Sequence, residues 1–176
     1  SVTIPLSKHS CDIRTRHWQP SRGRLRIMAD SARTSPKQRS EFAYFMTLQT
    51  RWSDNDVYGH VNNAIYYHFV DTVVNGYLLE QEVLDIEDSD VVGLVVETRC
   101  TYFAPLVFPQ SIDAGLRVAR IGRSSITYEI GLFAEGADTT SAFAVFVHVY
   151  VDRETQRPVD IPGPLREATE RLQIEL

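Results

Sequence analysis

The sequence has few cysteines and no long apolar run, and each scarcity excludes a class of protein. Only Cys11 and Cys100 occur in 176 residues, and their wide separation suggests neither a disulfide framework nor a cysteine-based metal site. The apolar stretch at 142–151 is interrupted by His148 and is too short for a membrane-spanning helix, which needs about 20 residues. We expect a cytoplasmic protein with no membrane segment and no metal or other cofactor.

Positive charge is scarce in most of the chain. Residues 28–176 carry twelve Lys/Arg against twenty-two Asp/Glu, whereas residues 1–27 carry six against one. The acidic part makes a poor match to nucleic acid, and we expect no nucleic-acid partner. Residues 1–40 lack helical or alternating periodicity and are rich in Arg and Ser, so we interpret them as a poorly ordered basic extension. A transit peptide or a basic arm that binds an acidic partner remain alternatives.

Residues 41–176 have the length and the apolar content of one domain with one core. Aromatic and β-branched residues at 42–52 predict a strand, and apolar residues spaced by three and four predict a long helix over 63–82, with Asn62 as its N-cap. A short helix is expected at 164–172. Four further strands are predicted at 91–103, 111–121, 125–134 and 141–152. Pro105 and Pro109 separate the first two, and hairpin turns at 122–124 and 135–138 separate the others.

This order of elements predicts an α+β fold in which one antiparallel sheet curves around one long helix. The outer face of such a sheet would still carry apolar residues, among them Val145, Val147 and Val149. We therefore expect a dimer that extends or backs the sheet.

The loop at 53–62 holds the densest group of reactive side chains in the sequence. Two carboxylates, Asp54 and Asp56, precede the imidazole of His60 and the carboxamides of Asn62 and Asn63, at the point where a strand ends and a helix begins. The free N–H groups of a helix N-terminus can polarise a carbonyl, and a nearby carboxylate can act as general base or as nucleophile. Because a thiolate with a pKa of about 8.5 leaves readily, thioester hydrolysis needs little more.

The string Asp54-x-Asp56-x-x-Gly59-His60-Val61-Asn62-Asn63-Ala64-x-Tyr66, after an aromatic strand and before a long helix, resembles the 4-hydroxybenzoyl-CoA thioesterase-like family of hotdog-fold proteins. The resemblance implies a central helix wrapped by a five- or six-stranded antiparallel sheet. It also implies hydrolysis of acyl-CoA thioesters without a metal ion. A homodimer with active sites at the subunit interface, often paired into a homotetramer, is the assembly expected from it.

The resemblance also assigns roles to residues. Asp56 matches the catalytic carboxylate, and the backbone N–H that polarises the thioester carbonyl falls on Asn63. His60 and Asn62 would orient the carboxylate, the water or the loop, and Asp54 would be structural. Substrate contacts are expected from Tyr58, Gly59 and Tyr67, and from the hairpin residues Arg123, Ser124 and Ser125 along the pantetheine arm.

Several other interpretations stay open. Asp54, Asp56 and His60 are also common turn residues, and the tyrosines of the helix are as typical of a core as of an acyl pocket. A hotdog hydratase would use an Asp and a His as an acid/base pair, and a non-catalytic acyl-thioester binding protein would keep the fold without turnover. The acyl group is not defined, and CoA is preferred to acyl carrier protein because the domain is acidic.

Overall fold

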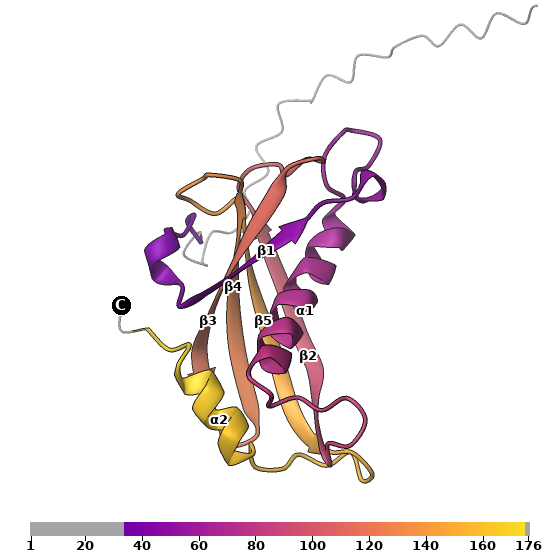
Figure 1. Ribbon diagram of the computed structural model, residues 1–176, viewed down its shortest axis with the longest axis vertical. Helices are drawn as coiled ribbons and strands as arrows, with labels where there is room; N and C mark the ends of the chain where they lie inside the picture. The colour runs from indigo at the N-terminus through magenta and orange to yellow at the C-terminus, as the bar shows by residue number, and fades with distance from the viewer. Residues whose placement is uncertain (1–33, 175–176) are drawn as a thin grey trace, which may run out of the picture. The chain divides into compact units, whose positions relative to one another are not determined.

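The computed structural model describes residues 34–174, which lie within one compact unit that begins at Thr34. A 3-10 helix η1 (Arg39–Glu41) and strand β1 (Tyr44–Gln49) come first, followed by a second 3-10 helix η2 (Trp52–Asp54) and the long helix α1 (Asn63–Glu80) (Figure 1). The rest of the unit is four strands and a short helix: β2 (Val91–Tyr102), β3 (Ser111–Ile121), β4 (Ser125–Ala134), β5 (Ala142–Asp152) and α2 (Gly163–Glu170). The predicted elements all form, with ends that move by a few residues.

The five strands form one antiparallel sheet in the order β1-β3-β4-β5-β2. Hairpins join β3 to β4 and β4 to β5, as their turn residues predict. The register shifts between Val118 and Arg120 and between Val95 and Glu97, and such irregularities increase the bend of a sheet. The sheet curves around α1, which confirms the predicted hotdog architecture with five strands (Figure 1).

The core lies between α1 and the inner face of the sheet. The helix buries residues spaced by three and four, and each such side chain contributes about 1.5–3 kcal/mol when it leaves water. The buried helix residues are Tyr66, Phe69, Val70, Val73, Val74, Tyr77 and Leu78. Helix α2 packs beside the C-terminal half of α1, where the Tyr77 hydroxyl donates a 2.7 Å hydrogen bond to the Ala168 carbonyl. The inner layer is therefore one long helix supported at its far end by a short one.

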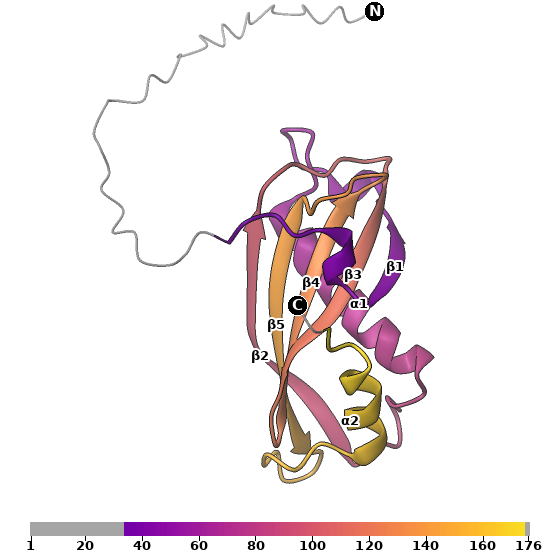
Figure 2. The same cartoon turned by 90° about the vertical axis from the view of Figure 1, so that its left-hand side faces the viewer.

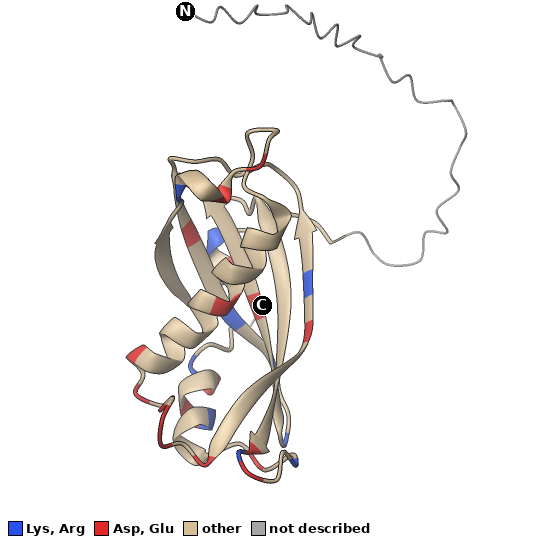
Figure 3. Ribbon diagram, turned by 90° about the vertical axis from the view of Figure 1, so that its right-hand side faces the viewer, with Lys and Arg blue, Asp and Glu red and all other residues tan. Residues whose placement is uncertain are grey.

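The two ends of α1 have different surroundings. Asn62 caps the N-terminal end, where its side chain accepts a 3.0 Å hydrogen bond from the Ala64 N–H, as predicted. At the C-terminal end the helix stops at Glu80, and the connector to β2 is rich in acids, among them Asp85, Glu87 and Asp88 (Figure 3). The N-terminal end of α1 carries the partial positive charge of the helix dipole, whereas the C-terminal end is negative and is followed by acids. A negatively charged group is therefore favoured at the N-terminal end.

A segment before β1 crosses the outer face of the sheet, opposite α1 (Figure 2). The ring of Phe42 sits over the cross-strand pair Gly115 and Gly131: a Cβ on Gly131 would lie 2.5 Å from Phe42 Cζ. Lys37 and Thr140 exchange two hydrogen bonds of 2.9 Å, so the segment is held from residue 37 onward. The boundary expected at residue 40 falls inside this anchored stretch, and residues 1–33 of the predicted extension lie outside the described residues.

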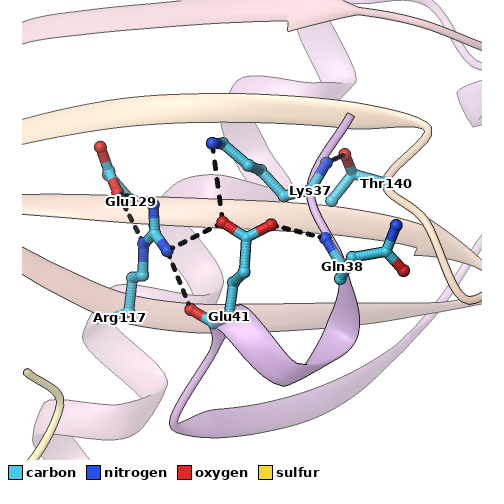
Figure 4. Close-up of polar contacts among 6 residues, drawn as sticks. All are labelled: Lys37, Gln38, Glu41, Arg117, Glu129 and Thr140. Atoms are coloured by element: carbon cyan, nitrogen blue, oxygen red, sulfur yellow. Dashed lines mark hydrogen bonds and ion pairs between the residues drawn. The ribbon is translucent and has the colours of Figure 1, made fainter. Parts of the chain in front are cut away.

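Ion pairs and hydrogen bonds also hold this segment before β1 against the sheet (Figure 4). Arg117, with a side chain only 8% exposed, pairs with Glu129 at 2.6 Å and with Glu41 at 3.3 Å. Burial raises the pKa of Glu41, but the Gln38 N–H together with Lys37 and Arg117 outweighs it and leaves the pKa below its usual value. We name residues 37–42 with these partners the outer-face clamp.

Candidate functional site

The loop between β1 and α1 is folded by Asp54. Its carboxylate is buried and accepts hydrogen bonds from the Arg51 N–H at 2.7 Å and from Arg51 Nε at 3.1 Å. Its carbonyl accepts a 2.8 Å bond from the Asn62 N–H, which brings the end of the loop back to its start. Asp54 therefore closes the loop and does not face its open side.

Asp56 lies at the centre of the loop and is only partly buried. Its Oδ1 accepts hydrogen bonds from the Tyr58 N–H at 2.8 Å and from the His60 N–H at 3.5 Å. Its own N–H donates to the His60 carbonyl at 2.8 Å, and Gly59 completes the turn with a φ of 80°, a conformation that glycine adopts without strain. Within residues 34–174 the hydrogen bonds of this carboxylate all reach Oδ1, so Oδ2 is available to another group.

The helix N-terminus lies beside this carboxylate. Asn62 accepts from Ala64 N–H through its side chain and from Ile65 N–H through its carbonyl, at 2.9 Å. Among the described residues no acceptor is paired with the Asn63 N–H, the first of the helix. An unpaired donor at the positive end of a helix suits a developing oxyanion.

Two cavities meet at Asp56 and Asn63, which line both of them. The smaller cavity, of about 370 Å³, is lined by Asp56, His60, Val61, Asn63, Tyr66, Tyr102, Phe103, Ala104 and Pro105. The larger, of about 860 Å³, is lined by Trp52, Asn55, Asp56, Val57, Tyr58, Gly59, Asn62 and Asn63. A group bound at Asp56 thus has space on two sides.

Aromatic rings form the floor of the smaller cavity. Tyr66 and Tyr102 pack edge to face with ring centres 4.9 Å apart. The Tyr66 hydroxyl accepts a 3.3 Å bond from the Leu106 N–H, and the Tyr102 hydroxyl donates to the Asn63 carbonyl at 3.4 Å. Burial raises the pKa of both phenols, so they are neutral at pH 7 and act as apolar surfaces with a hydroxyl edge.

The loop gathers six of the predicted site residues. Besides Asp56 and Asn63, His60 lines the smaller cavity, and Tyr58, Gly59 and Asn62 line the larger one. Tyr67, which is exposed on α1, lines neither of these cavities, whereas its neighbour Tyr66 lines the smaller one.

The hairpin residues Arg123, Ser124 and Ser125 are not brought to Asp56 within one chain. They come directly after the C-terminal end of β3, whereas the N-terminal end of β3 lies near the site. Because a strand of eleven residues is about 35 Å long, the hairpin and the site lie far apart. Arg123 instead forms an exposed ion pair with Asp160 at 2.9 Å. Contacts between this hairpin and a substrate at Asp56 would require a second copy of the chain.

Tyr102, Trp52 and Asn55 are among the site residues that the sequence did not reveal. Tyr102 and Trp52 line the cavities, and Asn55 ties the loop to the segment before β3 through a 3.2 Å bond from the Phe108 N–H to its Oδ1. Tyr102 lies at the end of a strand just before Pro105, and a strand end of this kind often borders a site. The roles of Trp52 and Asn55 depend on which way their side chains point.

The remaining ionisable groups of interest lie apart from the site. His148 is buried in the sheet among aromatic rings, and burial lowers its pKa to about 4. Cys100 is half-buried, and burial raises the pKa of its thiol. Residues 34–174 contain no cluster of three His, Cys, Asp or Glu side chains that would hold a metal ion, and no helix among them meets the length and apolarity of a membrane span.

Comparisons with known proteins place the chain in a family. The sequence model of the Thioesterase-like superfamily matches residues 50–169, which is more than half of the chain. The chain therefore belongs to the Thioesterase-like superfamily, and the predicted resemblance is confirmed at this level.

Individual proteins also resemble this chain. The crystal structure of the PA5185 protein from Pseudomonas aeruginosa PAO1 is 52% identical, covers 79% of this chain and 97% of its own, and has a TM-score of 0.77. YsmA of Bacillus subtilis strain 168 is 22% identical over 112 residues, 63% of this chain and 76% of its own. Slr0204, a 1,4-dihydroxy-2-naphthoyl-CoA thioesterase from Synechocystis, is 15% identical, covers 72% of this chain and 94% of its own, with a TM-score of 0.66, a likeness that shows the shared fold.

Proposed function

We propose that this protein is an acyl-CoA thioesterase that hydrolyses a thioester to the free acid and CoA. The observation that carries the proposal is that Asp56, with its Oδ2 open, and the unpaired Asn63 N–H line the same two cavities. Membership in the Thioesterase-like superfamily supports it, as does the acyl-CoA activity named for Slr0204.

The proposed reaction begins with the thioester carbonyl oxygen at the Asn63 N–H. Asp56 then either removes a proton from a water that attacks the carbonyl carbon or attacks that carbon itself to form an anhydride, which water opens. In both routes the C–S bond breaks, the thiolate leaves and takes a proton from solvent, and one oxygen of water is incorporated overall. The helix N-terminus stabilises the charge that develops on the carbonyl oxygen.

The other loop residues have supporting parts in this proposal. Asn62 occupies two neighbouring N–H groups of the helix and so directs the open one at Asn63 toward the substrate. His60 holds the loop through its backbone contacts with Asp56 and is among the residues that line the smaller cavity. A hydratase would need Asp56 and His60 to act on adjacent carbons of an acyl chain, which provides the alternative activity to test.

The test is thiol release from a panel of short, medium, long and aromatic acyl-CoA thioesters by the wild type and by Asp56→Asn, with Asp88→Asn, at an exposed carboxylate in the connector after α1, as the matched control. We expect turnover of at least one member by the wild type and a loss of about a hundredfold or more in Asp56→Asn at unchanged thermal stability. Wild-type protein that binds the panel but releases no thiol would refute the proposal, and water addition to an enoyl-CoA would then favour the hydratase.

We also propose that two copies pair along the edge strand β2. Three successive apolar residues, Leu94, Val95 and Val96, are exposed on this edge, and an exposed apolar edge strand invites pairing with another strand. Such a dimer would extend the sheet to ten strands. Light scattering after size exclusion should give the mass of a dimer for the wild type and of a monomer for Val96→Lys; a wild-type monomer, or a Val96→Lys dimer, would contradict the pairing.

A further inference from the structure

The division of the site into two cavities has a chemical meaning if the protein hydrolyses thioesters, and the inference here rests on that proposed function. A thioester has its reacting carbonyl in the middle, with an acyl group on one side and a thiol carrier on the other. Because Asp56 and Asn63 border both cavities, a carbonyl held by them must send its two substituents into different spaces.

The smaller cavity is suited to the acyl group. Apart from Asp56, His60 and Asn63, its lining residues are apolar or aromatic, and they include Val61, Phe103 and Pro105. Its floor is fixed by the contact between the Tyr66 and Tyr102 rings. The Tyr102 ring bounds this cavity of about 370 Å³ on one side, where a longer acyl chain would meet it.

The larger cavity is suited to the carrier. Trp52 and Tyr58 border it with 83% and 82% of their surfaces exposed, although rings of this size are usually packed. The Trp52 ring contacts Phe108 in a T-shaped arrangement, with ring centres 5.9 Å apart, and most of its remaining surface is open. A large exposed aromatic surface beside a reacting group marks a place for a partner molecule.

The charges of the residues around the larger cavity indicate which part of the carrier it binds. Asp56 is the only charged residue among those that line it, and Asn55 and Asn62 are neutral. Phosphate groups would find no cation there, whereas the pantetheine arm is uncharged, carries two amides and has methyl groups that can contact an aromatic face. The lining therefore fits the pantetheine arm better than the nucleotide.

We propose that the smaller cavity binds the acyl group, with Tyr102 limiting its length, and that the larger cavity binds the pantetheine arm through Trp52 and Tyr58.

The experiment separates the two halves of the substrate. A short and a longer acyl group are each attached to N-acetylcysteamine and to pantetheine, and kcat/KM is measured for all four thioesters. The variants are Trp52→Ala, Tyr58→Ala and Tyr102→Ala, with Trp52→Phe and Tyr102→Phe as conservative partners. Ile86→Ala, an exposed apolar residue in the connector after α1, is the matched control.

We expect Trp52→Ala to lower kcat/KM about tenfold on pantetheine thioesters, with less than a twofold change on N-acetylcysteamine thioesters and no change in acyl preference. Tyr58→Ala should act in the same direction, and Trp52→Phe should recover most of the loss. Tyr102→Ala should shift preference toward the longer acyl group on both carriers, whereas Tyr102→Phe should not.

Several results would overturn this division. One is a Trp52→Ala variant that loses equally on both carriers, and another is a Tyr102→Ala variant that keeps the wild-type acyl preference. A change of oligomeric mass in Trp52→Ala without the carrier effect would show that the exposed rings face a second copy instead. These outcomes differ from failure of the proposed function, in which the wild type releases no thiol from any of the four thioesters.

Discussion

The outer-face clamp and the loop at 53–62 are both short irregular segments beside β1, yet they differ in how completely their groups are satisfied. In the clamp, Phe42 fills a notch between two glycines and Arg117 is paired on both sides. In the loop, Asp56 keeps one oxygen open and Tyr58 is exposed, as is Trp52 directly before the loop. The difference teaches that the clamp stabilises the fold, whereas the loop leaves its groups available to a substrate.

The largest effect on stability is expected in the clamp. Phe42→Ala removes a buried ring from the Gly115 and Gly131 notch and should lower the free energy of unfolding by about 3–5 kcal/mol. The smaller loss expected for Phe45→Ala, whose side chain is partly exposed, provides the control. Urea unfolding measures both, and kcat/KM of the folded fraction should stay at the wild-type level. A Phe42→Ala variant of normal stability and reduced activity would reverse the contrast between the two regions.

The next largest effect is the pH dependence of stability caused by buried His148, for which exposed His68 is the control. Burial lowers the pKa of folded His148 to about 4, whereas an unfolded histidine titrates near 6.5. Between these values the unfolded state binds a proton that the folded state does not, so stability falls as the pH is lowered from about 6.5 to about 4. The change amounts to about 3 kcal/mol.

Unfolding measured at pH 7.5 and pH 4.5 checks this expectation. The acid loss should be smaller in His148→Leu than in the wild type, and His68→Leu should keep the wild-type loss. Equal acid losses in all three proteins would show that His148 does not carry the effect.

A third prediction concerns the charges of the clamp. Arg117→Met leaves Glu41 and Glu129 without their shared partner and should lower stability by about 2 kcal/mol, since both carboxylates keep some contact with water. The triple variant with Glu41→Gln and Glu129→Gln should recover part of that loss. A double-mutant cycle on unfolding free energies measures the coupling, and coupling energies near zero would mean that the ion pairs are incidental.

The smallest effect on stability is expected in the loop, where the effect on activity should dominate. Asn62→Ala removes the helix N-cap and should cost about 1 kcal/mol. Because the cap also directs the Asn63 N–H, kcat should fall roughly tenfold with little change in KM. Asn62→Ser, which keeps a capping oxygen, should retain most of the stability and most of the activity. If the Ser and Ala variants lost the same activity, the cap would not be the reason for the loss.

Much of the fold was predictable from local patterns. The bounds of β3 and β4 agree with the turn signals around them, and the N-cap at Asn62 forms as its side chain suggests. The loop residues were predictable as a group because they are consecutive in the sequence. Residues brought together from distant elements, such as Tyr102 and Tyr66, were not, since their contact depends on how the sheet curves around the helix.

Two further details of the structure depend on tertiary packing in the same way. Tyr66 and Tyr67 are adjacent in the sequence, but about 100° of helical rotation turns one into the core and the other outward. Residues 37–40 show no periodicity of their own, yet hydrogen bonds to Thr140 and the Asp138 carbonyl hold them against the sheet. The periodicity of apolar residues predicts which face of a helix or strand is buried. It gives no information about an irregular segment that is held in place by hydrogen bonds to another part of the chain.

The sequence by itself determined the order of elements, the helix cap and the family, because periodicity, turn residues and the Asp54-to-Tyr66 motif are local properties. The tertiary structure alone decided that Asp56 faces two cavities and that Arg123 lies at the other end of β3. The physical reason is that cavities and distances arise from the packing of side chains between elements, which local sequence patterns do not specify.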